Sequence, residues 1–154
     1  MEDPTRREHF HNTLYRLLEL GALPIINEND TIATDEIVIG DNDTLSAIVA
    51  ATVSADLLVL LSDIEGLYTA DPRQEPNARL INTVMDITPE IEALAGGNGT
   101  SLGTGGMVTK LRAARIAADS GIDMVIANGA RPELRYDILD GKPVGTRFIG
   151  RKKA

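Results

Sequence analysis

The sequence predicts an α/β fold: a mostly parallel β-sheet with helices on both faces. Three short apolar runs, at 22–26, 57–61 and 122–127, are each long enough for a buried strand. Between them lie stretches with helical spacing and helix-capping residues. Strands that alternate with helices are typical of parallel sheets buried on both sides. The length of 154 residues and the lack of a linker-like segment predict a single domain over residues 1–154.

The first elements can be placed in order. Asp3 and Pro4 suit the N-cap and first position of a helix, whose apolar stripe continues to Gly21. Residues 22–26 then predict a buried strand that ends in a polar cluster. Residues 34–39 alternate like a further strand, and small side chains over 44–54 predict a helix.

The remaining elements follow the same alternation. Residues 57–61 predict a buried strand, 71–78 a turn-rich loop, and 89–95 a short helix. A longer helix follows a glycine-rich run and ends near Gly121, a suitable C′ residue. The last predicted elements are a buried strand over 122–127, a helix over 132–139 and a strand over 146–149.

Composition excludes several classes of function. The sequence has no cysteine, which excludes disulfides, thiolate catalysis and cysteine zinc sites. Its two histidines, His9 and His11, both fall in the first predicted helix, where a solvated face is the expected role. A net charge of −8 argues against a nucleic-acid partner. No long apolar segment or signal-peptide pattern is present, so we expect no membrane association and a cytoplasmic location.

The run from Ser101 to Lys110 is the most informative stretch. Its glycines allow successive N–H groups to converge at the positive end of the helix that follows, and Lys110 adds a charge one turn in. Phosphate is the natural ligand of such a site. The spacing matches neither a P-loop nor the dinucleotide motif G-x-G-x-x-G. Taken alone the run is a weak signal, because a flexible surface loop before an ordinary helix has the same composition.

Polar residues follow several predicted strands at their carboxyl ends. They are the cluster 27–30, the pair Ser62-Asp63 and Asn128. Ligands of parallel α/β sheets bind beyond these ends, and the glycine run can reach the same edge. This convergence favours a binding site over a plain surface loop.

Asp41, Asn42 and Asp43 crowd the start of a predicted helix. One side-chain acceptor is enough to cap the helix, and acidic residues there also complement the helix dipole. The other acceptors are then available to hold a substrate ammonium group, orient a lysine or bind magnesium through water. Asp30 has the same two interpretations.

Four motifs in this order resemble the amino acid kinase family, and most closely those members that phosphorylate glutamate in the first step of proline biosynthesis. The likeness runs from about Arg6 to Gly150 and rests on Asn27-Glu-Asn-Asp30, Gly40-Asp-Asn-Asp43, Asp63-x-x-Gly66-Leu-Tyr-Thr-Ala-Asp-Pro72 and Leu102-Gly-Thr-Gly-Gly-Met-x-Thr-Lys110. It implies the family's three-layer sandwich, of which this chain would be an incomplete second portion.

The resemblance implies transfer of the γ-phosphoryl group of ATP to the side-chain carboxylate of L-glutamate, giving γ-glutamyl phosphate. Lys110 would stabilise the transferring phosphoryl group and Asp43 would orient Lys110. Magnesium would bridge the phosphates with few direct protein ligands. The resemblance assigns glutamate binding to Asn27, Asp30, Asp41 and Asn42, and ATP binding to Ser62, Asp63, Thr104, Gly105, Gly106, Met107, Val108, Thr109 and Lys110. Tyr68 and Asp71 would lie near the base or ribose.

The sequence also departs from the family pattern. Complete members begin with a strand and a Lys-x-Gly-Ser loop that supplies a second glycine-rich phosphate site, another catalytic lysine and a serine that contacts glutamate. This sequence has none of these, and it lacks the carboxyl-terminal RNA-binding-like module of some members. We therefore expect little activity from the chain alone, and either a homo-oligomer or association through an exposed sheet edge.

Three alternatives remain at this point. The first is a non-catalytic module that binds a nucleotide or amino acid and is completed by an N-terminal partner segment. The second is a dinucleotide oxidoreductase, which the glycine spacing disfavours. The third is a carbamate, aspartate or acetylglutamate kinase of the same family. The clusters at 27–30 and 40–43 favour glutamate within the family.

Overall fold

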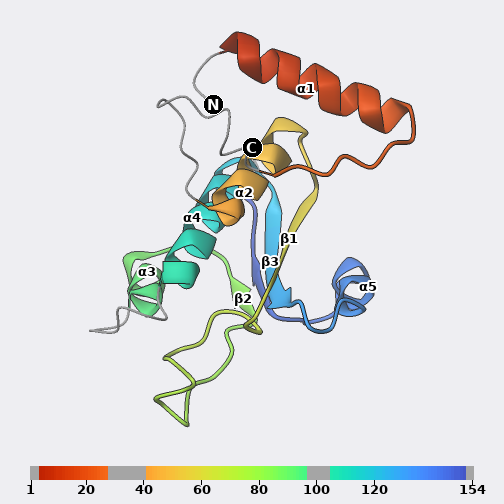
Figure 1. Cartoon of the computed structure of the whole chain (residues 1–154). Coiled ribbons are helices and arrows are strands. Elements are labelled where there is room, and N and C mark those ends of the chain that lie inside the picture. Colours follow the sequence, from red (N-terminus) through yellow and green to blue (C-terminus); the bar gives the residue numbers. More distant parts are fainter. Residues whose placement is uncertain (1–3, 28–40, 97–104, 152–154) are drawn as a thin grey trace.

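The computed structural model describes residues 4–27, 41–96 and 105–151. Helices and strands come partly in consecutive pairs and partly in alternation along this chain (Figure 1). In order they are α1 (Pro4–Glu19), α2 (Asn42–Thr52), β1 (Leu57–Ser62), β2 (Thr83–Val84), α3 (Pro89–Ala95), α4 (Gly105–Asp119), β3 (Asp123–Asn128), α5 (Leu134–Leu139) and β4 (Thr146–Phe148).

The described strands form one sheet in the order β1-β3-β4-β2. β1 and β3 are parallel, with Leu57 opposite Asp123 and Ser62 opposite Asn128. β2 and β4 are also parallel, whereas β4 runs antiparallel to β3. The prediction of an α/β fold with a mostly parallel sheet is therefore confirmed. The two-residue strand β2 was not predicted, because so short a segment carries no periodicity.

Alternate residues of the central strands enter two different cores. Leu58 and Leu60 of β1, with Met124 and Ile126 of β3, pack in the main core beneath α2, α3 and α4. On the opposite face, Leu57 and Val59 of β1 and Val125 and Ala127 of β3 pack with Ile138 of α5. Successive side chains of a strand point to opposite faces, so these sets cannot mix. Helices thus cover both faces, as predicted.

α2 and α4 lie side by side over the sheet (Figure 1). Their contact is built from small buried side chains, which allow two helices to approach closely: Ala47 and Ala50 of α2, and Ala113, Ala114 and Ala117 of α4. Both helices direct their amino-terminal ends toward the carboxyl end of β1. This arrangement positions the candidate site described below.

Two helix ends were predicted correctly from glycine. Gly21 and Gly121 have left-handed backbone angles, with φ of 71° and 79°. At α4, Ile122 N–H donates to the carbonyl of Ala117 and Gly121 N–H to that of Ala118. Residues 17–22 repeat the same pair of bonds at the end of α1. These bonds satisfy carbonyls that the helix leaves open, as in a Schellman motif.

The prediction of a buried strand over residues 22–26 is wrong. The segment has no regular structure, and its side chains are exposed, with Leu23 at 85% and Ile25 at 92%. An apolar run becomes a strand only where a neighbouring strand pairs with it, and no described strand lies beside this segment. The strand predicted over 34–39 lies outside the described residues. No helix in the described part is long and apolar enough to cross a membrane.

Candidate active site

The first turn of α2 is organised by Asp41. This residue is the N-cap, with an extended backbone, and its Oδ1 accepts a hydrogen bond from the backbone N–H of Thr44 at 2.6 Å. Its Oδ2 accepts a second bond from the Thr44 hydroxyl at 2.9 Å. Capping by Asp41 explains why α2 begins at Asn42, two residues before the predicted start. Both carboxylate oxygens of Asp41 thus support the helix.

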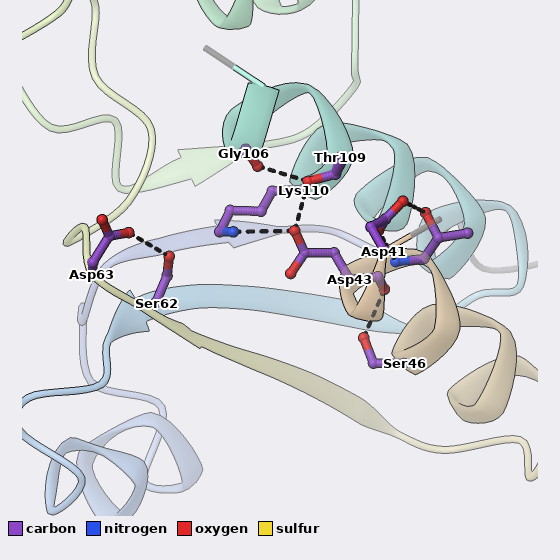
Figure 2. A network of polar contacts seen from close by, with 9 residues as sticks. Asp41, Asp43, Ser46, Ser62, Asp63, Gly106, Thr109 and Lys110 are labelled. Atoms are coloured by element: carbon purple, nitrogen blue, oxygen red, sulfur yellow. Dashed lines mark hydrogen bonds and ion pairs between the residues drawn. The ribbon is translucent and has the colours of Figure 1, made fainter. Parts of the chain in front are cut away.

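Asp43 instead reaches across to α4 (Figure 2). Its Oδ2 lies 3.1 Å from the ammonium nitrogen of Lys110 and accepts a hydrogen bond from the Thr109 hydroxyl at 2.7 Å. Asp43 comes from the first turn of α2, and Thr109 and Lys110 from the first two turns of α4. The close packing of the two helices brings these groups together across 67 residues of sequence.

This ion pair is largely withdrawn from water. The Lys110 side chain is 11% exposed and that of Asp43 22%. Partial burial strengthens the attraction between the two charges and fixes the direction of the lysine side chain. The Thr109 hydroxyl also lies 2.9 Å from the carbonyl oxygen of Gly106. It has one proton, so it donates either to Asp43 or to that carbonyl.

The amino-terminal turn of α4 is open beside this pair. Among the described residues, a Cβ atom built at Gly106 would meet no atom within 4 Å outside the nearby backbone of α4 itself. Val108 is 42% exposed, whereas Met107 packs against the main core. The first N–H groups of a helix have no partner within the helix, and they carry its positive dipole end. Gly105 and Gly106 therefore give an anion access to backbone donors next to Lys110.

The carboxyl ends of β1 and β3 lie beside the same helix end. Ser62 and Asn128 are opposite each other in the parallel register, and the Ser62 carbonyl accepts a hydrogen bond from Gly129 at 2.7 Å. The Ser62 hydroxyl donates to Asp63 at 3.1 Å, and both residues lie on the Lys110 side of Figure 2. Asn128 accepts from Ala130 N–H and so stabilises its own turn.

Tyr68 and Asp71 belong to the loop that follows β1. Tyr68 donates to Glu65 at 2.9 Å, and partial burial, with the hydrogen bond and negative charge of Glu65, raises the pKa of Tyr68. The Asp71 carboxylate accepts from Arg73 N–H and from the Gln74 side chain. Both residues are thus held by local contacts.

One buried polar contact beside this loop was not anticipated. The Thr146 side chain at the start of β4 is fully buried and bonds to the backbone of Leu67 and Ile81. The first of these bonds joins residues 79 positions apart, and no local sequence pattern signals such a contact.

The structure brings together part of the predicted site. Asp43, Thr109 and Lys110 are in direct contact, and Ser62, Asp63 and the first turn of α4 lie around them. Asn42 is exposed at the start of α2, and Asn27 is exposed at the end of the irregular segment. Asp30 and Thr104 lie outside the described residues.

Metal ligands do not cluster in the described part of the chain. No three histidine, aspartate or glutamate side chains there come close enough together to hold an ion. The carboxylate of Asp43 contacts Thr109 and Lys110.

Comparison with known proteins gives a consistent result. The family model described as "Amino acid kinase family" matches residues 1–128. The chain is 51% identical to "Glutamate 5-kinase" of Clostridium perfringens, over 99% of this chain and 58% of that protein. It is 57% identical to "Glutamate 5-kinase" of Carboxydothermus hydrogenoformans, over 99% of this chain and 41% of that protein. The chain thus spans about half the length of these relatives.

The fold also resembles a solved kinase structure. "Carbamate kinase from Giardia lamblia bound to AMP-PNP" superposes with a TM-score of 0.61 and 25% identity. The match covers 91% of this chain and 49% of that one.

Proposed function

The chain belongs to the amino acid kinase family, and from this premise we propose that it carries the nucleotide side of a site that transfers the γ-phosphoryl group of ATP to the side-chain carboxylate of L-glutamate. The observation that carries the proposal is the Asp43–Lys110 pair beside the open amino-terminal turn of α4. The pair supports the proposal because it lies next to the first turn of α4, whose N–H groups have no partner within the helix.

The chemistry of the reaction fits this set of residues. A glutamate side chain has a pKa of about 4.3 and is already ionised at neutral pH, so the acceptor needs no general base. The barrier comes from bringing two anions together, and it is lowered by positive charge and by positioning. Lys110 would supply the charge, and Asp43 and Thr109 would hold Lys110 and the helix end in place.

ATP fits the edge formed by α4 and the carboxyl end of β1. The first backbone N–H groups of α4, from residues 105–107, are suited to its phosphates, and Ser62 and Asp63 lie on the same side in Figure 2. The AMP-PNP bound to the related carbamate kinase supports a nucleotide ligand for this fold. Magnesium is expected to arrive on the phosphates of ATP, which needs few protein ligands; the steps assigned here are those of the protein side chains.

Glutamate is the acceptor that the relatives support. The relatives named above are called glutamate 5-kinases and match nearly the whole chain at more than 50% identity. Asn27, Asp30 and Asn42 would bind the amino acid, together with Asp41 where its capping bonds leave a lone pair free. The product would be γ-glutamyl phosphate, as expected for the first step of proline biosynthesis.

A second function is binding of nucleotide without turnover. It is favoured by one observation, that the chain spans 58% of one relative and 41% of another. On this hypothesis residues 1–154 are the second portion of a kinase domain. Turnover then requires the remaining portion of such a domain.

The test is trapping of the acyl phosphate with hydroxylamine, which converts it to a hydroxamate. The chain is incubated with ATP, magnesium and glutamate, alone and with an added amino-terminal segment of a relative. We expect Lys110→Ala to lower hydroxamate formation by about 100-fold or more, since it removes the charge that stabilises the transition state. Lys142→Ala is the matched control, because Lys142 pairs with Asp137 on α5, away from the site.

Three outcomes are informative. Hydroxamate from the chain alone supports the kinase function without a partner segment. ATP binding that requires Lys110, with hydroxamate only after the segment is added, supports the second function. Equal hydroxamate from the parent and Lys110→Ala would show that Lys110 does not have the role proposed here.

A further inference from the structure

The loop between β1 and β2 is joined to β4 by one backbone bond, from the Arg147 N–H to the Asn82 carbonyl, and by one buried hydroxyl. Two arms of this loop, 67–69 and 79–81, run antiparallel, with Tyr68 opposite Leu80. Ile81 N–H donates to the Leu67 carbonyl at 2.8 Å, and Thr69 N–H donates to the Arg79 carbonyl at 2.9 Å. The arms therefore form a short two-stranded ladder that extends from the end of the sheet.

Hydroxyl groups take part at both ends of this ladder. At one end the Arg79 N–H donates to the Thr69 hydroxyl at 3.0 Å, and at the other end a hydroxyl from β4 replaces a backbone bond. In an antiparallel pair of this type, Leu67 and Ile81 would exchange two backbone hydrogen bonds. Only one is present. In place of the other, Leu67 N–H donates to the Thr146 hydroxyl at 2.8 Å, and that hydroxyl donates to the Ile81 carbonyl at 2.6 Å. The hydroxyl thus bridges both arms and joins them to β4.

The Thr146 side chain is closely surrounded by its neighbours. Its side chain has 0% exposure, and its hydroxyl uses its proton and accepts one bond. The residue before Leu67 has to be glycine, because a Cβ at Gly66 would lie 2.4 Å from the Thr146 hydroxyl oxygen and 3.0 Å from its backbone nitrogen. The arm is therefore fitted closely against the start of β4.

This loop leads directly out of the candidate site. Asp63 follows the end of β1 and lies on the side of the site toward which Lys110 points in Figure 2. Leu67 comes four residues later in the sequence. Any shift of the arm at Leu67 moves Tyr68 and changes the path of the chain back to Asp63. A group that fixes the arm at Leu67 therefore also limits movement of the chain between Leu67 and Asp63.

We propose that Thr146 is a positioning residue for nucleotide binding: its buried hydroxyl holds the 66–82 loop in the arrangement in which the loop lines the nucleotide side of the site. Thr146 would touch no substrate and would act through Leu67, Ile81 and the residues between them. The nucleotide part of this inference rests on the proposed function, whereas the structural part does not.

The test compares Thr146→Val, which keeps the shape and removes the hydroxyl, with Thr146→Ser, which keeps the hydroxyl. Hydrogen exchange of the full chain is measured without nucleotide, and ATP affinity is measured by calorimetry. For Thr146→Val we expect exchange in residues 67–82 to become about tenfold faster, exchange in β3 to stay unchanged, and the Kd for ATP to rise about tenfold. Thr146→Ser should restore both.

Gly66→Ala provides a second route if Thr146→Val does not fold. It keeps the hydroxyl but forces the arm away from it, so it should reproduce the faster loop exchange and weaker ATP binding. The two substitutions act on one contact. The double variant should therefore bind ATP no more weakly than the single variant that binds it more weakly.

The outcomes separate the two proposals. Unchanged loop exchange in both Thr146→Val and Gly66→Ala would overturn the role of Thr146. Faster exchange with unchanged ATP affinity would show that the loop does not line the nucleotide side, and would also overturn it. Absence of ATP binding by the parent chain would refute the proposed function and the nucleotide part of the inference, while the exchange result still decides whether Thr146 holds the loop.

Discussion

Asp41 and Asp43 are two positions apart but have different partners. Asp41 directs both carboxylate oxygens to Thr44 and completes the amino-terminal end of α2. Asp43 accepts from Thr109 and Lys110 on another helix. A helix start that is capped by one acidic residue leaves the second free for a tertiary contact. Residue by residue, the candidate site consists of the Asp43–Lys110 ion pair next to Gly106, which has space beside it.

Substitution of Gly106 is expected to have opposite effects on stability and on ligand binding. Glycine in a helix is less stable than alanine, and a Cβ at Gly106 meets no atom within 4 Å. We expect Gly106→Ala to raise the free energy of unfolding by about 0.5–1 kcal/mol. If phosphate approaches this backbone, the added methyl group should raise the Kd for ATP by about tenfold.

Urea unfolding and calorimetric titration with ATP measure the two effects. Gly96→Ala is the control, because a Cβ at Gly96 also meets no atom and this residue lies at the end of α3. A Gly106→Ala chain with unchanged ATP affinity would argue that the anion does not approach this turn.

At the scale of elements, the contact between α2 and α4 determines the geometry of the site. Ala47 is one turn after Asp43, has 0% exposure and packs in the core that α4 shares. Small buried alanines on both helices, Ala47 and Ala50 of α2 and Ala113, Ala114 and Ala117 of α4, favour a close approach of the two helices. The distance between Asp43 and Lys110 therefore depends on side chains that carry no charge.

Ala47→Leu should separate the two helices. Overpacking of a buried site costs about 1–3 kcal/mol, and the displaced α2 should weaken the Asp43–Lys110 pair. We expect a lower free energy of unfolding together with weaker ATP binding. Ala93→Leu, on the exposed side of α3, should change stability by less than about 0.5 kcal/mol and leave ATP binding unaltered. Normal ATP affinity in a destabilised Ala47→Leu chain would contradict this link.

Elements with local signals were predicted well from the sequence. Gly21 and Gly121 end their helices because only glycine readily adopts the required backbone angle, and Asp41 lies next to the helix that it caps. The buried strands at 57–61 and 122–127 were predicted from continuous apolar runs. Such runs occur because helices cover both faces of the sheet, so side chains on both sides of each strand are apolar. The wrong strand at 22–26 shows the limit: its apolar run is genuine, but pairing depends on a neighbour that the run itself does not encode.

The residues of the site and its surroundings also fall into those that a local pattern predicts and those that it does not. The glycine run and the acidic cluster are visible as motifs, and the structure brings Asp43, Thr109 and Lys110 into contact. Thr146 could not be found, because its role arises from hydrogen bonds to residues 65 and 79 positions away. A single threonine at the start of a strand has no distinguishing spacing. Long-range polar contacts of this kind need the folded arrangement.

At the scale of the molecule, β1 is at one end of the described sheet. It pairs with β3 on one side, and Leu61 near its end is 48% exposed. Strand edges with unpaired backbone groups favour association with another strand. We expect the chain to associate at high concentration through this edge.

Leu61→Lys should weaken that association, because a charged side chain disfavours pairing at an edge. The dissociation constant measured by sedimentation should rise about tenfold, which corresponds to about 1.4 kcal/mol. Met85→Lys is the control, because Met85 is 67% exposed and lies next to β2 at the opposite end of the sheet. A larger effect from Met85→Lys than from Leu61→Lys would place the contact at the other edge.

The antiparallel direction of β4 has a practical consequence. Because Phe148 lies opposite Met124 at the beginning of β3, the chain leaves the sheet at the end opposite the carboxyl ends of β1 and β3. There the Gly150 N–H bonds to Asp123 and the Arg151 N–H to Ala118, which anchors the last described residues. A tether attached beyond Arg151 would therefore leave the carboxyl ends of β1 and β3 open to solution. We expect that a chain immobilised in this way can be titrated with nucleotide without obstruction by its attachment.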